Sequence, residues 1–338
     1  MAGSRPEKEG FIVLELKNRN RDREEADMSA VTTLRYHVPS DQEGWQLRSV
    51  LMTGMGISRR LLVRLRSEEG AIRVNGQPRW LHVPVQQGDC VEVMLPEEFS
   101  DDILPQPMDI DVIHEDEHLL IVHKPAGIIV HPTSGHYANT LANGIVHRWL
   151  ERGERHRFRP IHRLDQDTSG LLAVAKNAYA HQFISDQFQR GYVRKTYLAV
   201  VYGELAADAG TVDGPIDRDP NEPHVRIVTL DGSPSVTHYE VAERFRGATL
   251  VRLKPVTGRT HQIRVHMKFI GHPLIGDALY TDAERVTPPE RPLIGRQALH
   301  ACDLSFTHPY SKTAVKYEAP LPEDMLRLID SLRESGAN

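Results

Sequence analysis

The sequence is poor in cysteine, has no long apolar run and carries no excess of positive charge. Its two cysteines, Cys90 and Cys302, lie far apart and outside any CxxC pair, which argues against a disulfide framework or a thiolate zinc site and favours a reducing compartment. No apolar stretch approaches the roughly 20 residues that span a bilayer, so we expect no membrane contact and a cytoplasmic protein. Because the formal net charge is −5, binding of nucleic acid would require local basic patches.

The chain has 338 residues, of which 40% are apolar and 26% charged. This length and composition suit a globular protein of two or three domains. The opening "MAGSRPEKEG" is polar and lacks a signal-peptide pattern. We expect a charge-rich mobile tail over residues 1–30, with Met28 as an alternative start. A small domain then covers 31–96, an acidic, proline-bearing linker 97–108, and a larger domain 109–332.

The small domain has one helix signal and one hairpin signal. In "ISRRLLVRLRSEEG" the apolar residues follow a helical spacing between Ser58 and Gly70. In "AIRVNGQPRW" two alternating apolar residues lead into an Asn-Gly turn, which is typical of a β-hairpin. The segment "GDCVEVML" supplies a further strand. These signals predict a compact α/β unit.

The larger domain has mostly strand signals interrupted by a few helices. "YVRKTYLAVVYG" and "ATLVRLKPV" alternate as strands, and "HLLIVHKPAGIIVHP" predicts two short strands around Lys124 and Gly127. "NAYAHQFISDQFQRG" predicts a helix capped by Asn177 and ended by Gly191. Because few βαβ spacings occur, we expect an α+β fold with a mixed, mainly antiparallel sheet.

A polar turn precedes an apolar run in "HRLDQDTSGLLAVAKN". The apolar half predicts a buried strand, and the turn would present Asp165 at its edge with little freedom. A turn aspartate that only bonds local amides is the alternative. Asp167, two positions later, is better explained as such a turn residue.

A second polar segment is "PVTGRTHQIRVHMKFIGHPLIGD". It predicts a helix over 260–271 with His261, Arg264 and Lys268 on one face. Arg264 is flanked by apolar residues and could pair with a carboxylate, holding it ionised, whereas Lys268 is better read as solvated. Three histidines, His261, His266 and His272, indicate metal binding only weakly, and we expect no metal.

The third polar segment is "RKTYLAVVYG", in which Lys195 and Tyr197 would share one face of a strand. A tyrosine can stack on a planar ring and move a proton, or it can simply cap a core. The three segments, together with "EDEHLLIVHKPAGIIVHP", occur in the order of the motifs of the RluA/RluD-type RNA pseudouridine synthases, and 109–321 resembles that family.

The resemblance implies a catalytic domain with a central RNA-binding cleft and an isomerisation of uridine to pseudouridine. The reaction moves the ribose bond from a ring nitrogen to a ring carbon, so it needs no cofactor. By their match to the family motifs, Asp165 would be the nucleophile, Arg264 its partner and Tyr197 the residue that packs on the target base. Arg163 would fill the gap left by a flipped uridine, and Lys195 would contact the RNA. Whether Asp165 attacks ring or sugar, or removes a sugar proton, stays open.

The small domain resembles the S4-like RNA-binding module, through "GISRRLLVRLRSEEGAIRVNG" and "VQQGDCVEV". Its opening "WQLRSVL" departs from the usual aspartate-leucine start. Between residues 45 and 95, seven arginines face only four acidic residues, so this stretch is basic within an acidic chain. Arginines along one helix are suited to contacts with RNA phosphates. The alternative is a surface helix that is rich in arginine and has no such role. The candidates are Arg59, Arg60, Arg64 and Arg66.

The expected partner is structured RNA, most often large-subunit ribosomal RNA for a protein with this module, with transfer RNA as an alternative; a monomer is expected. A catalytically weak RNA-binding or ribosome-assembly factor is a second hypothesis. A hydrolase acting on a nucleoside or glycoside is a third, which the absence of a second well-placed carboxylate and the presence of the S4-like segment disfavour.

Overall fold

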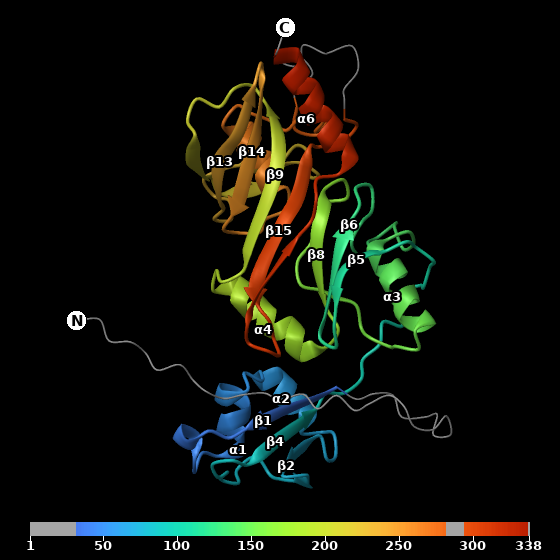
Figure 1. Ribbon diagram of the computed structural model, residues 1–338, viewed down its shortest axis with the longest axis vertical. Coiled ribbons are helices and arrows are strands. Elements are labelled where there is room, and N and C mark those ends of the chain that lie inside the picture. The colour runs from blue at the N-terminus through green and yellow to red at the C-terminus, as the bar shows by residue number, and fades with distance from the viewer. Residues whose placement is uncertain (1–31, 282–293, 337–338) are drawn as a thin grey trace, which may run out of the picture.

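The computed structural model describes residues 32–281 and 294–336. The expected tail over 1–30 and the alternative start at Met28 lie outside these residues. The described chain forms a small four-stranded sheet and a large ten-stranded sheet, each with its own helices and its own apolar core. Figure 1 shows the small unit below the large one. Neither contains a helix with the length and apolarity that crossing a bilayer would take, as far as the described residues go.

The small sheet has the strand order β1-β4-β2-β3, with all three ladders antiparallel. Its strands are β1 (Thr33–His37), β2 (Ile72–Val74), β3 (Gln77–Pro78) and β4 (Cys90–Met94). Its helical segments are the 3-10 turn η1 (Ser40–Gln42), α1 (Leu47–Ser49), the π turn η2 (Val50–Gly54) and α2 (Arg59–Leu65).

The predicted helix and hairpin of this unit are confirmed. Ser58 caps α2, since its Oγ accepts a hydrogen bond from the Leu61 amide at 3.0 Å. The apolar face of α2 is buried. Between β2 and β3, Asn75 and Gly76 both have positive φ, of 51° and 75°, as a two-residue hairpin turn requires.

The large sheet runs in the order β10-β13-β14-β9-β15-β8-β6-β5, with β16 paired to β15 and β7 to β8. The first strands are β5 (Asp111–Glu115), β6 (Leu119–Lys124), β7 (Arg159–Pro160), β8 (Ser169–Ala175) and β9 (Arg194–Tyr202). The later ones are β10 (Ala209–Asp213), β13 (Val236–Phe245), β14 (Ala248–Pro255), β15 (Leu299–Thr307) and β16 (Ala314–Glu318). A separate ribbon joins β11 (Ile216–Arg218) to β12 (Arg226–Val228). This mixed, mainly antiparallel α+β architecture confirms the predicted fold class.

The two halves of the large sheet meet where β8 pairs with β15, the one parallel ladder among the described strands. At this junction Gly170 has φ 121°, and a Cβ built there would lie 2.2 Å from the carbonyl oxygen of Ala301. Only glycine allows the two backbones to come this close. The junction lies next to the loop that carries Asp165.

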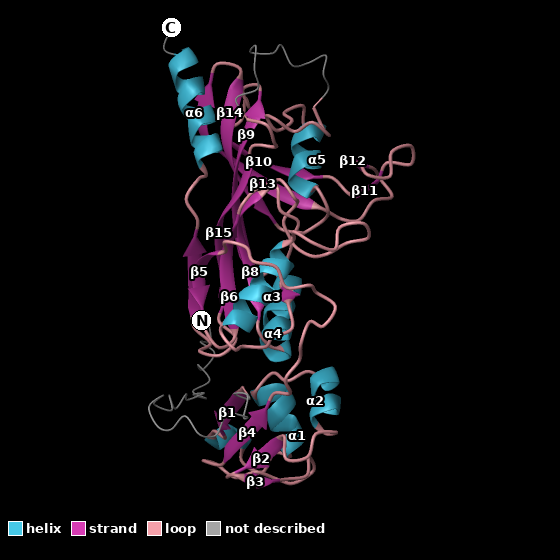
Figure 2. Cartoon of the chain, turned by 90° about the vertical axis from the view of Figure 1, so that its right-hand side faces the viewer, coloured by secondary structure: helices cyan, strands magenta, loops and turns pink. Residues whose placement is uncertain are grey.

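Four helices cover the two faces of this sheet. On one face α3 (Leu141–Glu151) and α5 (Gln262–Phe269) pack into the largest core cluster. The helices α4 (Ala178–Gln189) and α6 (Glu323–Gly336) pack into two further clusters. Figure 2 shows α5 and α6 on opposite sides of the strands. The predicted cap of α4 is confirmed, because the Asn177 side chain accepts from the Ala180 amide at 2.9 Å.

Two predicted elements are wrong. Residues 128–130 form no strand, because the carbonyls of Ile129 and Val130 accept hydrogen bonds from the first amides of α3 instead. His261 is not part of the helix: it precedes α5 with φ 57°, in the left-handed region. It therefore does not share a helix face with Arg264 and Lys268.

The segment 97–108 is packed rather than free. Ile103 is buried, and the Asn143 side chain donates to the Leu104 carbonyl at 2.7 Å. Glu98 forms ion pairs with Arg64 of α2 and with Arg159 of β7. The same carboxylate thus connects the small unit to the large one.

Candidate active site

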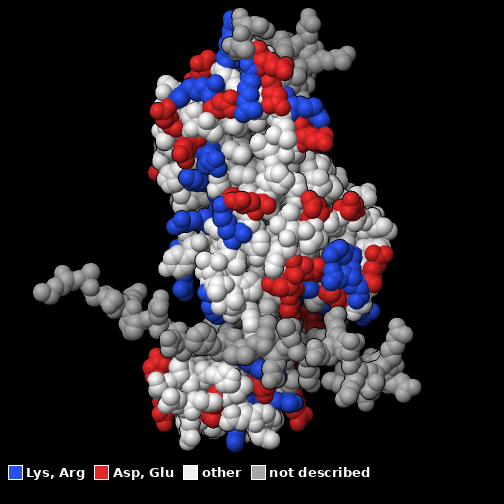
Figure 3. Space-filling model, in the orientation of Figure 1, with Lys and Arg blue, Asp and Glu red and all other residues white. Residues whose placement is uncertain are grey.

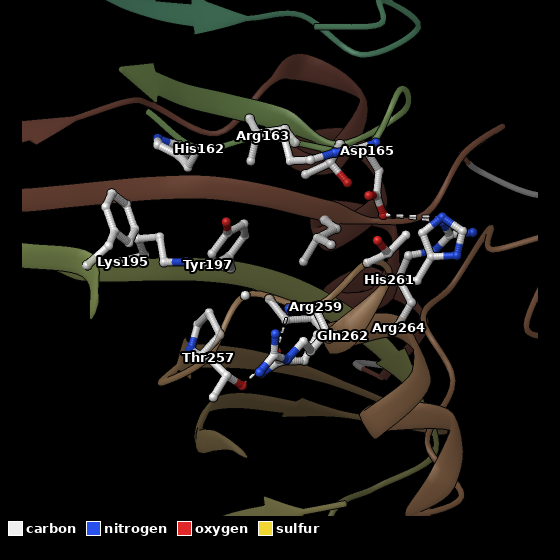
Figure 4. A pocket seen from close by; sticks show the side chains of 18 of the residues that line it. His162, Arg163, Asp165, Lys195, Tyr197, Thr257, Arg259, His261, Gln262 and Arg264 are labelled. Atoms are coloured by element: carbon white, nitrogen blue, oxygen red, sulfur yellow. Dashed lines mark hydrogen bonds and ion pairs between the residues drawn. The ribbon is translucent and has the colours of Figure 1, made fainter. Parts of the chain in front are cut away.

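A pocket of about 310 Å³ opens on the α5 side of the large sheet, and Figure 4 shows its lining side chains. Five segments of the chain line it. They are the loop before β8, the end of α4 with Phe188, the strand β9, the segment that leads from β14 into α5, and the start of β15. The pocket brings together five of the residues singled out from the sequence: Arg163, Asp165, Lys195, Tyr197 and Arg264.

Asp165 stands in the loop between β7 and β8. Its carbonyl accepts from the Thr168 amide at 3.1 Å, which closes the expected turn. The next residue, Gln166, is fixed by the buried Lys124, whose Nζ donates to the Gln166 carbonyl at 2.8 Å and also to the carbonyls of Pro125 and Ile128. The Asp165 side chain is 21% exposed, so this carboxylate is held firmly while one side remains open to the pocket.

Arg264 connects Asp165 to a second carboxylate. Its Nη1 donates to Asp165 Oδ2 at 3.3 Å, and its Nε and Nη2 donate to the two oxygens of Asp277 at 2.7 and 2.8 Å. Burial opposes the charge of Arg264, but the hydrogen bonds and charge of Asp277, helped by Asp165, raise its pKa above the ordinary value. The guanidinium also lies 4.9 Å over the Tyr280 ring.

Asp277 is a site residue that the sequence reasoning did not single out. Its side chain is 0% exposed, so it cannot touch a substrate directly. It holds Arg264 in a bidentate, charge-assisted pair, and Arg264 in turn faces Asp165. The only available signal was its position at the end of the quoted motif. A second carboxylate is therefore present near Asp165, but it lies behind the arginine, where it cannot act as the partner acid of a glycosidase.

Lys195 and Tyr197 lie on the same face of β9, as predicted, and both line the pocket. Burial lowers the pKa of Lys195 to about 8. Burial, together with the nearby charge of Asp165, raises the pKa of Tyr197 above its ordinary value. The phenol is therefore a neutral, largely buried ring at the wall of the pocket at neutral pH. The ammonium group of Lys195 lies 5.2 Å from the centre of the Phe188 ring, which also lines the pocket.

Arg163 is exposed at the rim of the pocket. Within the described part of the chain its guanidinium makes no ion pair. Figure 4 places it beside Asp165 on the loop before β8. Such a side chain can move over the opening without breaking an existing contact.

His261 is a further pocket residue. Its Nδ1 is 2.8 Å from the Tyr280 hydroxyl, which itself accepts from the Arg226 amide. The Nε2 atom of His261 lies 3.9 Å from Asp165 Oδ2. Burial lowers the pKa of His261 despite the nearby carboxylate, which favours the neutral ring at pH 7.

The other two histidines of this segment point elsewhere. His266 contacts Thr237 and the Gly214 carbonyl, and His272 contacts the Tyr202 carbonyl. Within the described ranges, no group of three or more His, Cys, Asp or Glu side chains is arranged to hold a metal ion. Lys268 is exposed on α5, away from the pocket lining.

The arginines of α2 fall into two groups. Arg59, Arg60 and Arg66 are exposed, whereas Arg64 is paired with Glu98. Figure 2 shows α2 projecting on the same side of the molecule as α5. The face drawn in Figure 3 has acidic and basic side chains interleaved without a large patch of one sign.

The fold and the pocket define a pseudouridylate synthase domain. The structure is similar to that of human RNA pseudouridylate synthase domain containing 4, with a TM-score of 0.54 and 25% identity, covering 66% of this chain and 93% of that one. Human RNA pseudouridylate synthase domain containing 1 gives a TM-score of 0.51 at 27% identity, and the match covers 68% of this chain and 97% of that one.

Sequence comparisons agree. The family model described as RNA pseudouridylate synthase matches residues 118–269. A Bacillus subtilis protein named uncharacterized RNA pseudouridine synthase YlyB is 45% identical over 80% of this chain and 88% of its own length. The ribosomal large subunit pseudouridine synthase D of Neisseria meningitidis is 38% identical over 88% of this chain and 81% of its own length. The chain belongs to the RluA/RluD-type family of RNA pseudouridine synthases and has their isomerase activity.

Proposed function

We propose that this enzyme converts specific uridines of large-subunit ribosomal RNA to pseudouridine, with Asp165 as the catalytic carboxylate. The observation that carries the proposal is the ionic chain from Asp277 through Arg264 to Asp165 at the pocket floor. A relative named for the large ribosomal subunit matches over most of both chains, which supports ribosomal RNA over transfer RNA. Such a reaction would take place in the cytoplasm, and we expect a monomer to suffice.

In the proposed reaction the bond from ribose C1′ to uracil N1 breaks, and a bond from C1′ to C5 forms. The proton on C5 is lost and N1 gains one, so atoms balance without a cofactor. Arg264 keeps Asp165 ionised and aimed at the target nucleotide, whether the carboxylate attacks ring or sugar or removes a sugar proton. The pocket holds the detached uracil close to C1′ until it has turned.

The other pocket residues have supporting parts in this proposal. Tyr197 packs on the target base as a neutral ring and is placed to assist proton transfer. Arg163 fills the gap left by the flipped nucleotide, which offsets part of the few kcal/mol of unstacking. Lys195 contacts the RNA near the pocket.

The small unit would serve as the S4-like RNA-binding module. Arg59, Arg60 and Arg66 have the exposure that phosphate contacts need. Arg64 would contribute less to RNA binding, because its guanidinium already pairs with Glu98.

The test uses cells that lack the protein, rescued with wild-type, Asp165→Asn or Asp167→Asn chains. Pseudouridines are mapped by a carbodiimide readout across ribosomal and transfer RNA. We expect sites in large-subunit RNA that the wild type and Asp167→Asn restore and Asp165→Asn does not. If no site depends on the protein, or if transfer RNA alone loses its sites, the substrate proposal fails. Release of free uracil from the RNA would point instead to a hydrolase.

A further inference from the structure

A second hollow lies on the small unit, far from Asp165 in the fold. It encloses about 710 Å³ between the end of α2 and the segment that follows β3. Trp80 stands at its wall with 77% of its surface exposed. An exposed indole of this size is unfavourable in water, and the residue contributes nothing to the core of the unit. Its exposed position is therefore better explained by ligand binding than by a contribution to the stability of the fold.

The backbone around Trp80 is fixed. Its carbonyl accepts from the Val83 amide at 3.1 Å, and the Leu81 and Val83 carbonyls accept from the Arg48 and Leu47 amides at 2.9 Å. These hydrogen bonds attach the segment to the start of α1. A ring on a firmly held backbone loses little conformational freedom when another ring stacks on it.

Three exposed arginines, Arg48, Arg66 and Arg79, line the same hollow. Within the described residues none of their guanidinium groups makes an ion pair or a hydrogen bond. By contrast, Arg64 pairs with Glu98, and Arg73 donates to the Gly70 carbonyl.

The carboxylates of Glu68 and Glu69 also reach this hollow, so the three uncommitted cations exceed the local negative charge by one. An aromatic platform beside free guanidinium groups is the combination that binds unpaired nucleotides, with the base on the ring and the phosphates on the arginines.

We propose that the Trp80 hollow binds an unpaired nucleotide of the substrate RNA, with its base stacked on the indole. The guanidinium groups of Arg48, Arg66 and Arg79 hold the adjoining phosphates. This inference rests on the proposed function in assuming an RNA substrate, and it adds a second anchoring point outside the catalytic pocket. An RNA that offers an unpaired base at the matching distance is selected over one that does not.

The test uses tryptophan fluorescence of the full chain with a short single-stranded oligouridylate. Trp45 and Trp149 are half-buried and buried, so the difference between wild type and Trp80→Phe isolates the Trp80 signal. We expect the oligouridylate to quench this signal and the matching double-stranded RNA to leave it unchanged. Trp80→Ala weakens binding of the oligouridylate about 10-fold, and Trp80→Phe weakens it less, in line with the ~1–3 kcal/mol of a stacked base.

Leu230→Ala is the matched control, because Leu230 is 96% exposed and outside the hollow. On substrate RNA, Trp80→Ala raises KM about 10-fold and leaves kcat unchanged. Unchanged affinity in Trp80→Ala, or equal quenching by duplex RNA, overturns the inference and leaves the surface to another partner. Quenching that persists in Asp165→Asn supports the inference independently of the catalytic role proposed for Asp165.

Discussion

Arg264 lies between two carboxylates of different exposure, since Asp277 is sealed from solvent and Asp165 is 21% exposed. We expect Asp277→Asn to reduce the rate of a single turnover about 100-fold, because the guanidinium loses the charge that fixes it toward Asp165. Breaking a buried pair costs about 3 kcal/mol of the free energy of unfolding. Stopped-flow single turnovers and thermal unfolding measure the two effects, and affinity for RNA is expected to change little.

The double variant Arg264→Met with Asp277→Leu separates the two effects. It removes both buried charges, so it recovers most of the lost stability and none of the activity. A wild-type rate in Asp277→Asn would contradict the role assigned to Asp277.

Lys124 is the second buried charge near the site. Its ammonium group is 0% exposed and donates to three carbonyls. Lys124→Met leaves these carbonyls without their donor, so we expect a loss of about 3–5 kcal/mol in the free energy of unfolding, measured by urea titration. Activity falls as well, since the Gln166 carbonyl beside Asp165 is no longer fixed. A variant as stable as the wild type would show that the carbonyls find other donors.

Lys195 predicts a pH dependence. Burial lowers its pKa to about 8, so the side chain is positive below pH 8 and neutral above it. Affinity for RNA should therefore fall by about fivefold between pH 7 and pH 9, as one charged contact worth roughly 1 kcal/mol is lost. Fluorescence anisotropy measures it. Lys195→Arg stays charged and should remove this step, whereas a step that persists there comes from another group.

The sequence motifs singled out five residues that the structure places in one pocket: Arg163, Asp165, Lys195, Tyr197 and Arg264. The roles assigned to them stay predictions. The sequence was insufficient for Asp277 and Tyr280, because nothing in a linear pattern shows which side chain will lie behind a buried arginine. His261 was assigned to the helix because helical spacing carries no sign of a left-handed residue at its start.

At the scale of elements, the contact between β8 and β15 places the Asp165 loop beside β9. Gly170→Ala adds a methyl group 2.2 Å from a backbone oxygen, so the strands must separate. We expect a loss of more than about 3 kcal/mol of stability and a matching loss of activity, by thermal unfolding and turnover assays.

Gly153→Ala is the control for this change. Gly153 also has positive φ, of 70°, but an added Cβ would meet nothing within 4 Å. Its cost should stay near 1 kcal/mol. Equal costs at the two positions would show that backbone conformation, rather than the close approach of the strands, limits position 170.

Most strands and helices were predictable because their apolar periods and caps are local. The predicted strand at 128–130 shows where this fails, because the carbonyls of Ile129 and Val130 accept from the first amides of α3 rather than from a neighbouring strand. In the parallel pairing of β8 with β15, Ser169 lies opposite His300, which is 131 residues further along the chain. No local sequence pattern predicts such a pairing.

At the scale of the molecule, Tyr179 and Tyr310 of the large unit pack into the core cluster of the small one. The Tyr179 hydroxyl donates to the Met55 carbonyl at 2.8 Å and accepts from Lys312. We expect Tyr179→Ala to split a single calorimetric unfolding transition into two, because the shared cluster couples the units. Tyr137→Ala, at an exposed tyrosine, should keep one transition. Two transitions already in the wild type would contradict this coupling.

The position of β15 has a consequence for the order of events during synthesis. This strand lies in the middle of the large sheet, between β9 and β8, yet among the described strands of that sheet only β16 follows it in the chain. Until residues 299–307 emerge, β8, which follows the Asp165 loop, and β9, which carries Tyr197, have no common neighbour. A nascent chain therefore cannot assemble the pocket before β15 has been synthesised, although the residues from Arg163 to Arg264 that line it are already made.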